Sequence, residues 1–264
     1  MVKLILEKVK LKSKEINDGE YKVIIKIKKL TVKHEVEILK NINLNIEKNK
    51  ITALVGSSGC GKSTLLKSIN LMLDKELHQE GEILYLENNI LEYPKETLRK
   101  EIGLVFQSPT PLPFSVYKNL TYGYEYHHKN IDNLDNLVEK MLKKIGLFHE
   151  INDFNMEANK LSGGQQQRMC IARTLMVNPK VILLDEPCSA LDVKNTLNIE
   201  NLLKEICHEY TIVIVTHNLS QARRISDNLI YMEEGEIIES GKTQDVFNNP
   251  KDERTKKYLQ LEKV

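Results

Sequence analysis

Cysteine, net charge and long apolar runs are all scarce in this sequence. Only four cysteines occur among the 264 residues, and Cys60, Cys170, Cys188 and Cys207 lack the spacing of metal ligands. We therefore expect free thiols in a reducing compartment, not a disulfide framework or a zinc site. Lys and Arg number 38 against 37 Asp and Glu. With so little net charge, no overall field attracts nucleic acid or anionic lipid, and no nucleic-acid partner is expected.

The apolar runs are too short to cross a membrane. Residues 181–184 and 212–215 are among the longest, whereas a membrane-spanning helix needs about 20 apolar residues. The apolar patch in residues 1–7 is too brief for a signal-peptide core, and no small-residue cleavage site follows it. We expect a chain without a transmembrane segment that stays in the cytoplasm.

The first hundred residues show the periodicities of a β portion followed by a strand, a loop and a helix. Residues 2–12 and 21–32 alternate around a turn at 17–19, which predicts a β-hairpin. An amphipathic strand is expected at 42–46, and the apolar run 51–55 predicts a buried parallel strand. Helical spacing of apolar residues follows from Leu65 to Leu73, so this segment is half of a doubly wound α/β unit.

The rest of the chain alternates helices with buried strands. Residues 108–160 are expected to be mainly helical, with a helix that starts at the N-cap Asp132 and stops at Gly146. Buried strands at 181–185 and 211–216 flank a helical stretch at 194–207, and a hairpin turns at Glu234-Gly235. Without internal repeats or low-complexity linkers, residues 1–264 are predicted to form one α/β unit with a helical insertion at about 108–160.

A glycine-rich loop lies between the strand at 51–55 and the helix that follows it. The sequence fits G-x-x-x-x-G-K-[ST], the pattern of a phosphate-binding P-loop, in the strand–loop–helix context that this pattern requires. Its glycines allow backbone N–H groups to turn inward as an anion nest, the lysine adds a full charge, and the serine hydroxyl is suited to Mg²⁺. The predicted nucleotide-binding residues are Gly56, Ser57, Ser58, Gly59, Cys60, Gly61, Lys62, Ser63 and Thr64.

A second anion site is predicted at the start of another helix. The residues are Leu161, Ser162, Gly163, Gly164 and Gln165. We call them the pentad. A Ser-Gly-Gly helix N-terminus binds anions, but a nucleotide held by one glycine loop has no need of a second on the same side. Two such surfaces suggest a nucleotide sandwiched between two molecules.

The pentad together with the P-loop resembles the ABC ATPases, over about residues 30–245. The resemblance implies ATP and Mg²⁺ as ligands, and a fold in three parts: an antiparallel β portion that includes residues 81–90, a parallel-sheet core and a helical insertion. The resemblance also implies that Asp185 holds Mg²⁺ together with Ser63. It implies that Glu186 orients or deprotonates the attacking water.

The same resemblance gives roles to residues in three other loops. Gln107 matches the glutamine that reaches Mg²⁺ and the attacking water while signalling to a membrane subunit. His217 matches the histidine that contacts the γ-phosphate. The loop that crosses to the partner subunit corresponds to Ser189, Ala190, Leu191 and Asp192.

Three segments resemble the ATPase of phosphate importers more closely: residues 105–117, 165–173 and 185–192. The chain also departs from that subfamily. Residues 31–36 lack the tyrosine that stacks on adenine; His34 is the nearest planar candidate, although it suits a plain surface position equally. Val193 stands where the family has proline.

The resemblance implies the ATP-hydrolysing subunit of an importer. Its expected partners are a second copy in a head-to-tail dimer, two integral-membrane permease subunits, whose short helix enters a cavity around Gln107, and indirectly an extracytoplasmic substrate-binding protein. Its expected place is the cytoplasmic face of the membrane. Phosphate is the expected cargo; molybdate, tungstate, an amino acid or a metal ion is the alternative. A non-transport ABC clamp would carry coiled coils or two motif sets, and a nucleotide kinase or GTPase would leave the pentad unused.

Overall fold

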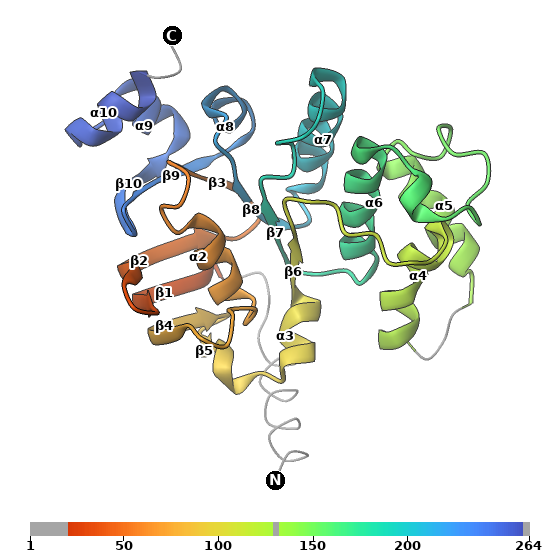
Figure 1. The fold of residues 1–264 in the computed structure, drawn as a ribbon, viewed down its shortest axis with the longest axis horizontal. Coiled ribbons are helices and arrows are strands. Elements are labelled where there is room, and N and C mark those ends of the chain that lie inside the picture. The colour runs from red at the N-terminus through yellow and green to blue at the C-terminus, as the bar shows by residue number, and fades with distance from the viewer. Residues whose placement is uncertain (1–20, 129–131, 261–264) are drawn as a thin grey trace.

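The computed structural model describes residues 21–128 and 132–260, which fold around two sheets with helices packed beside them (Figure 1). One sheet is antiparallel and the other is largely parallel. The buried apolar residues form two clusters, one on each face of the parallel sheet. In strand β3 (Ile51–Gly56), Ala53 belongs to one cluster and Leu54 to the other, and neighbouring parallel strands alternate in the same way. The cluster that contains Leu54 also holds the buried residues of the antiparallel sheet.

The antiparallel sheet has the strand order β2-β1-β4-β5. Alternation in the sequence produces it: Ile25, Ile27, Leu30 and Val32 of β1 are buried, while polar residues between them face outward. Its strands are β1 (Val23–Lys33), β2 (Glu37–Glu47), β4 (His78–Tyr85) and β5 (Asn88–Asn89), and the short helix η1 (Ile90–Glu92) follows.

The second sheet has the order β10-β9-β3-β8-β7-β6. Strands β6, β7, β8, β3 and β9 run parallel, and β10 closes the sheet as an antiparallel hairpin with β9. Their continuous apolar sequences suit strands that are covered on both faces. The bounds are β6 (Ile102–Val105), β7 (Val181–Asp185), β8 (Thr211–Val215), β9 (Asn228–Glu233) and β10 (Glu236–Lys242).

Helices cover this sheet and connect its strands. They are α2 (Lys62–Ile69), α3 (Lys95–Glu101), α7 (Val193–Ile206), α8 (Leu219–Ile225), α9 (Thr243–Asn248) and α10 (Glu253–Gln260). Figure 1 shows α9 and α10 beside the β9–β10 hairpin, at the opposite end of the molecule from the helices between β6 and β7.

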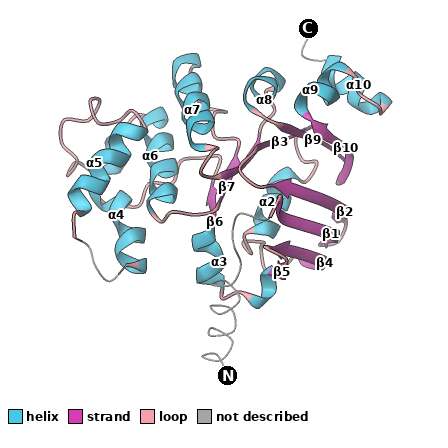
Figure 2. Cartoon of the chain, turned by 180° about the vertical axis from the view of Figure 1, so that it is seen from behind, coloured by secondary structure: helices cyan, strands magenta, loops and turns pink. Residues whose placement is uncertain are grey.

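The helices between β6 and β7 gather beside α7 (Figures 1 and 2). They are α4 (Val116–His127), α5 (Leu134–Lys144), η2 (Ala158–Lys160) and α6 (Gly163–Met176). Apolar residues of all three α-helices share one buried cluster with the parallel sheet. Among residues 21–128 and 132–260, no helix is long and apolar enough to span a membrane.

Most of the strands predicted from the sequence are present. The strands expected at 51–55, 181–185 and 211–216 are β3, β7 and β8, and the hairpin at Glu234-Gly235 joins β9 to β10. The α/β class, with an antiparallel and a parallel sheet, is thus confirmed.

Two local predictions had different outcomes. The first arm of the N-terminal hairpin, residues 2–12, lies outside the described residues, and the second arm is β1, which pairs with β2 and β4. The N-cap prediction at Asp132 was wrong: α5 starts one residue later, after Asn133, whose left-handed φ of 60° suits asparagine. Gly146 does end that helix, with a φ of 69°.

Candidate nucleotide site

Four parallel strands end at one edge of the second sheet and bring the predicted site residues to the same place. The P-loop follows β3, Gln107 follows β6, Glu186 follows β7 and His217 follows β8. Carboxyl ends of parallel strands meet along one sheet edge, which is where α/β proteins bind ligands.

The P-loop has a backbone that only glycine tolerates at its first and last glycines. At Gly56, φ is 152° and a Cβ would lie 2.1 Å from the carbonyl oxygen of Met232; at Gly61, φ is 104° and a Cβ would lie 2.7 Å from Leu39. A Cβ at Gly59 would meet nothing within 4 Å, so this part of the loop is open.

Lys62 gives this loop its positive charge. Only 6% of the residue is exposed, and its Nζ donates to the carbonyl oxygens of Gly56 at 2.9 Å and Ser57 at 2.7 Å. Cys60 Sγ lies 3.8 Å from the same nitrogen. The ammonium is thus held at the inside of the loop, within reach of an anion bound there.

Ser63 and Asp185 form a pair of hard oxygen ligands. Ser63 Oγ donates to Asp185 Oδ1 at 3.0 Å. Burial raises the pKa of Asp185, an effect that the hydrogen bond from Ser63 opposes. A hydroxyl and a carboxylate beside a phosphate site fit Mg²⁺, which keeps several waters and takes few protein ligands. The described residues contain no cluster of three or more His, Cys, Asp or Glu that could enclose a metal ion.

Glu186 is the point where three loops meet. Its Oε2 accepts a hydrogen bond from Gln107 Nε2 at 3.1 Å and lies 3.2 Å from His217 Nδ1. Its backbone N–H donates to the carbonyl oxygen of Val215 at 3.0 Å, and its φ of 44° is left-handed. The fold therefore brings together a glutamine, a glutamate and a histidine from three separate strand ends.

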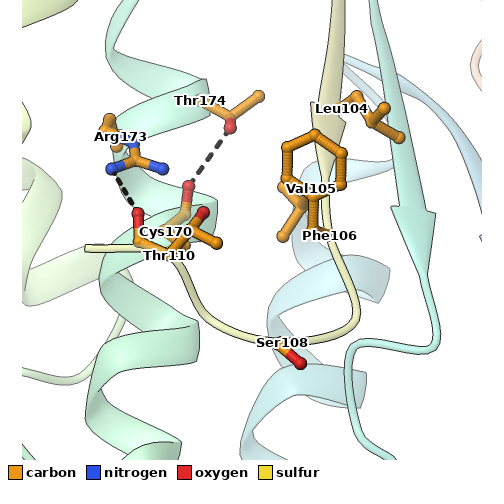
Figure 3. Close-up of a pocket in the computed structure, with 8 residues that line it drawn as sticks. All are labelled: Leu104, Val105, Phe106, Ser108, Thr110, Cys170, Arg173 and Thr174. Atoms are coloured by element: carbon orange, nitrogen blue, oxygen red, sulfur yellow. Dashed lines mark hydrogen bonds between the residues drawn. The ribbon is translucent and has the colours of Figure 1, made fainter. Parts of the chain in front are cut away.

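The loop after Gln107 is fixed to helices α4 and α6. Asn119 Oδ1 accepts from the backbone N–H of Leu112 at 2.8 Å, and Asn119 Nδ2 donates to the carbonyl oxygen of Leu112 at 3.1 Å. Arg173 Nη1 donates to the carbonyl oxygen of Thr110 at 2.9 Å, as Figure 3 shows. The cavity in Figure 3 has about 10 Å³, room for about one water molecule. It is lined by Leu104, Val105, Phe106, Ser108, Thr110, Cys170, Arg173 and Thr174.

The pentad lies at the start of α6, away from the P-loop. Ser162 is the N-cap: its Oγ accepts from Gln165 N at 3.4 Å, and Gln165 Oε1 accepts from Ser162 N at 3.0 Å. A Cβ at Gly163 would meet nothing within 4 Å. Within the described residues, no hydrogen bond joins 161–165 to 56–64. The P-loop and the pentad of one chain are thus separate surfaces.

The loop at 189–192 touches the pentad through α7. Asp192 caps that helix by accepting from Asn195 N at 2.8 Å, and its other carboxylate oxygen accepts from Asn195 Nδ2 at 2.8 Å. A Cβ at Gly164 would lie 2.9 Å from Asn195 Cγ. The pentad and this loop therefore share one contact residue.

Within the part of the chain that the structure describes, His34 makes no contact that defines a base site. It lies in the exposed bend between β1 and β2, where its backbone N–H donates to the carbonyl oxygen of Val36 at 3.1 Å. The next residues of β2 do border the P-loop, because a Cβ at Gly61 would meet Leu39. Stacking of His34 on adenine stays a prediction.

Two groups of residues near the site were missed by the sequence analysis. The first is an ionic network between α7 and α8: buried Glu200 accepts from Arg224 at 2.7 and 3.1 Å and from Gln221 Nε2 at 3.3 Å. The second is Tyr258 of α10, which packs beside the P-loop strand. No local pattern marks either group, since each depends on pairing between distant segments.

Comparison with known proteins agrees with this architecture. The sequence profile of the ABC transporter family matches residues 39–189. The phosphate import ATP-binding protein PstB of Staphylococcus saprophyticus is 45% identical over 94% of this chain and 88% of its own length. PstB 3 of Streptococcus pneumoniae is 48% identical, over 85% of this chain and 92% of its own length.

Solved structures show the same fold. CbiO1 of Clostridium perfringens, part of the ABC transporter complex cbiONQ, is 31% identical with a TM-score of 0.77, covering 92% of this chain and 100% of that one. A bacterial Atm1-family ABC exporter with ATP bound has a TM-score of 0.80 at 24% identity, covering 92% of this chain and 42% of the exporter chain. With the profile matching more than half of the sequence and relatives of 45–48% identity, this chain belongs to the ABC transporter family and has its ATP-binding fold.

Proposed function

We propose that this chain is the ATP-hydrolysing subunit of an ABC importer, acting as a Mg²⁺-dependent head-to-tail dimer. One observation carries the proposal: the P-loop lysine, a Ser–Asp pair suited to Mg²⁺ and a glutamate with glutamine and histidine neighbours all lie at the carboxyl ends of adjacent parallel strands. This set serves hydrolysis of a nucleoside triphosphate better than binding alone.

Binding falls to the P-loop. Its open stretch around Gly59 receives the phosphates, with N–H groups of residues 57–61 and the N-terminus of α2 directed at their charge. Lys62 exchanges its carbonyl partners for phosphate oxygens, which carry full negative charge. Ser63 and Asp185 would hold Mg²⁺, which neutralises charge that develops on the phosphates.

Hydrolysis falls to Glu186. Its carboxylate accepts a proton from, or orients, the water that attacks the terminal phosphate. Gln107 and His217 both approach Oε2 of this carboxylate. His217 is 63% exposed in its side chain, so it is free to turn towards a γ-phosphate while still near Glu186.

A second copy completes each site. The pentad exposes Ser162 and Gly163 on a surface that its own P-loop does not reach. In a head-to-tail dimer the pentad of one chain covers the nucleotide of the other. The coupling to the loop at 189–192 through Asn195 connects the two halves of that interface.

The surface between the Gln107 loop and α4 is the proposed dock for a short helix of a permease subunit. Phe114, Tyr122 and Tyr126 are exposed there, and the rings of Phe114 and Tyr122 stack at 5.8 Å. Such an aromatic surface suits an apolar helix face. The chain would then sit at the cytoplasmic face of the membrane, against two permease subunits and indirectly linked to an extracytoplasmic substrate-binding protein.

Inorganic phosphate is the proposed cargo, since the similar proteins are named phosphate import ATP-binding proteins. Deleting the gene should impair uptake of labelled phosphate at low external concentration, and plasmid-borne wild type should restore it. Unchanged phosphate uptake together with lost uptake of molybdate, tungstate, an amino acid or a metal ion would reassign the cargo.

The dimer mechanism is tested with Glu186→Gln. The amide keeps the size of the side chain but cannot accept a proton, so ATP should bind and remain intact. Sedimentation should then show a dimer with MgATP and a monomer without it, because nucleotide binding and association form one linked equilibrium.

Two further variants complete this test. Adding Ser162→Arg to Glu186→Gln should abolish the dimer, and Glu92→Gln, an exposed glutamate outside the site, should behave as wild type. A Glu186→Gln protein that still hydrolyses ATP would refute the role of Glu186.

A further inference from the structure

The guanidinium of Arg168 is buried in the second turn of α6, the helix that begins with the pentad. Only 3% of the Arg168 side chain is exposed. Its Nη1 donates to the carbonyl oxygens of Ile145 at 3.3 Å and Gly146 at 3.1 Å, just after the last residue of α5. A buried guanidinium needs such acceptors, because it cannot lose its proton. Arg168 therefore ties α6 to the end of α5.

Glu150 pairs with the same guanidinium through both of its carboxylate oxygens. Arg168 Nη1 donates to Oε1 at 3.0 Å and Nη2 to Oε2 at 2.6 Å, the bidentate geometry of a strong ion pair. The hydrogen bond from Arg168 is the main cause that holds the pKa of Glu150 below its usual value, although burial opposes it. Glu150 therefore stays an ionised carboxylate, which accepts hydrogen bonds and donates none.

The side chain of Gln165 lies between Glu150 and the N-cap of α6. Its Nε2 donates to Glu150 Oε2 at 3.2 Å, and its Oε1 accepts from the backbone N–H of Ser162 at 3.0 Å. The two ends of an amide group have nearly the same shape, so their hydrogen-bond partners decide which end points where. Because the Glu150 carboxylate only accepts, it binds the NH₂ end of the amide, and the carbonyl end is directed at Ser162.

This orientation of Gln165 closes the capping box at the start of α6. In the other half of the box, Gln165 N donates to Ser162 Oγ at 3.4 Å. A capping box satisfies two backbone donors and so fixes the first turn of a helix. With the amide reversed, its NH₂ end would face the N–H of Ser162, and one half of the box would be lost. Ser162 and Gly163, the exposed residues of the pentad, belong to this turn.

We propose that Glu150 is a positioning residue of the pentad: held by Arg168, it fixes the amide of Gln165 and so the first turn of α6, which meets the nucleotide of the partner chain. The inference rests on the proposed dimer and extends it, since it makes the connection between α5 and α6 a part of the dimer's nucleotide site. Glu150 need not touch the nucleotide to act in this way.

The test is Glu150→Gln in the full-length Glu186→Gln chain, which is expected to bind MgATP without hydrolysing it. An amide at this position donates as well as accepts, so it no longer holds Gln165 in one orientation. The fold should persist, because Arg168 keeps its two carbonyl acceptors at the end of α5. The dissociation constant of the dimer, measured by sedimentation with MgATP, should rise about three- to tenfold per site. For a dimer with two such sites, the rise should be about ten- to hundredfold.

Glu200→Gln in the same chain is the matched control. Glu200 also accepts from one arginine and one glutamine: from Arg224 at 2.7 and 3.1 Å and from Gln221 Nε2 at 3.3 Å. Among the described residues, its carboxylate has no hydrogen bond to the pentad. The control should therefore dimerise like the Glu186→Gln parent, and thermal unfolding shows whether the two variants differ in stability.

Gln165→Met tests whether Glu150 acts through Gln165. Methionine has a similar size, but it has neither the amide donor nor the amide acceptor that joins Glu150 to Ser162. It should weaken the dimer about as much as Glu150→Gln does. The double variant should be no weaker than the weaker single variant, because both changes remove the same link. Binding of a fluorescent ATP analogue to the monomer, at low protein concentration, should keep the Kd of the parent, because the P-loop is unchanged.

Weaker dimers in both single variants, without further loss in the double variant and at an unchanged monomer Kd, support the inference. If Glu150→Gln unfolds below the assay temperature, Glu150→Asp takes its place, because the shorter carboxylate keeps the charge beside Arg168 but draws back from Gln165. Dimerisation at parental strength in either single variant would overturn the inference. Losses that add in the double variant, or an equal loss in Glu200→Gln, would do the same.

The Glu186→Gln parent distinguishes this inference from the proposed function. If the parent dimerises with MgATP and Glu150→Gln dimerises equally well, only the role of Glu150 falls. If the parent stays monomeric with MgATP, the proposed dimer falls, and the role of Glu150 falls with it.

Discussion

The ionic network between α7 and α8 predicts an unequal response to removing its two charges. Glu200 has a side chain only 3% exposed, whereas that of Arg224 is 45% exposed. Arg224 donates two hydrogen bonds to the carboxylate, at 2.7 and 3.1 Å, and Gln221 donates one at 3.3 Å. Removing the arginine leaves a charge buried inside the protein, but removing the glutamate leaves a charge on a side chain that is already 45% exposed.

The magnitudes follow from that burial. Deleting one partner of a buried pair costs roughly 3–5 kcal/mol. The remaining Gln221 donor and the exposure of Arg224 place Arg224→Met at the low end, about 3 kcal/mol. Glu200→Gln keeps a hydrogen-bonding group of the same size beside Gln221 and should cost about 1 kcal/mol.

Urea unfolding followed by circular dichroism measures both variants. Arg224→Met should shift the midpoint to clearly lower urea than Glu200→Gln, at an unchanged slope. The double variant should be more stable than Arg224→Met alone, because the stranded charge is gone. A Glu200→Gln protein as destabilised as Arg224→Met would refute the reasoning from burial.

Three further results are expected at the site itself. Lys62→Ala should abolish ATP binding in calorimetry, because it removes the full positive charge of the P-loop; wild-type affinity would contradict the site. Gly56→Ala should lose ATP affinity and unfolding stability more than Gly59→Ala, since only the first Cβ meets a backbone atom, at 2.1 Å; equal losses would contradict this. Burial raises the pKa of Cys188 to about 11. The rate at which iodoacetamide alkylates Cys188, measured by peptide mass spectrometry, should therefore rise about tenfold per pH unit from pH 7 to 9 without a plateau. A plateau near pH 8.5 would mean an ordinary thiol.

Local sequence patterns were enough to predict the parallel core and the position of the P-loop between a strand and a helix. Continuous apolar runs mark β3, β7 and β8, and the glycine spacing marks the P-loop, because these features depend on neighbouring residues alone. The strand ends then follow, so that the convergence of Gln107, Glu186 and His217 was within reach of the sequence once the family resemblance was noted.

Contacts between distant segments were out of reach. Nothing near Tyr258 indicates that its ring meets Tyr231, and nothing near Glu200 indicates a partner 24 residues later in α8. The start of α5 was missed for a local reason: the sequence offers two adjacent N-cap candidates, Asp132 and Asn133. The left-handed backbone selects the second, because asparagine tolerates that conformation readily.

The left-handed backbone of Glu186 has a consequence for how this position can evolve. A non-glycine residue with a φ of 44° carries a conformational cost of about 1–3 kcal/mol, which glycine would avoid and a β-branched residue would increase. Stability alone thus favours glycine, which has no side chain that could take part in a reaction. Keeping glutamate here trades stability for activity, so drift towards glycine should be tolerated by the fold and opposed only by selection on the proposed ATPase.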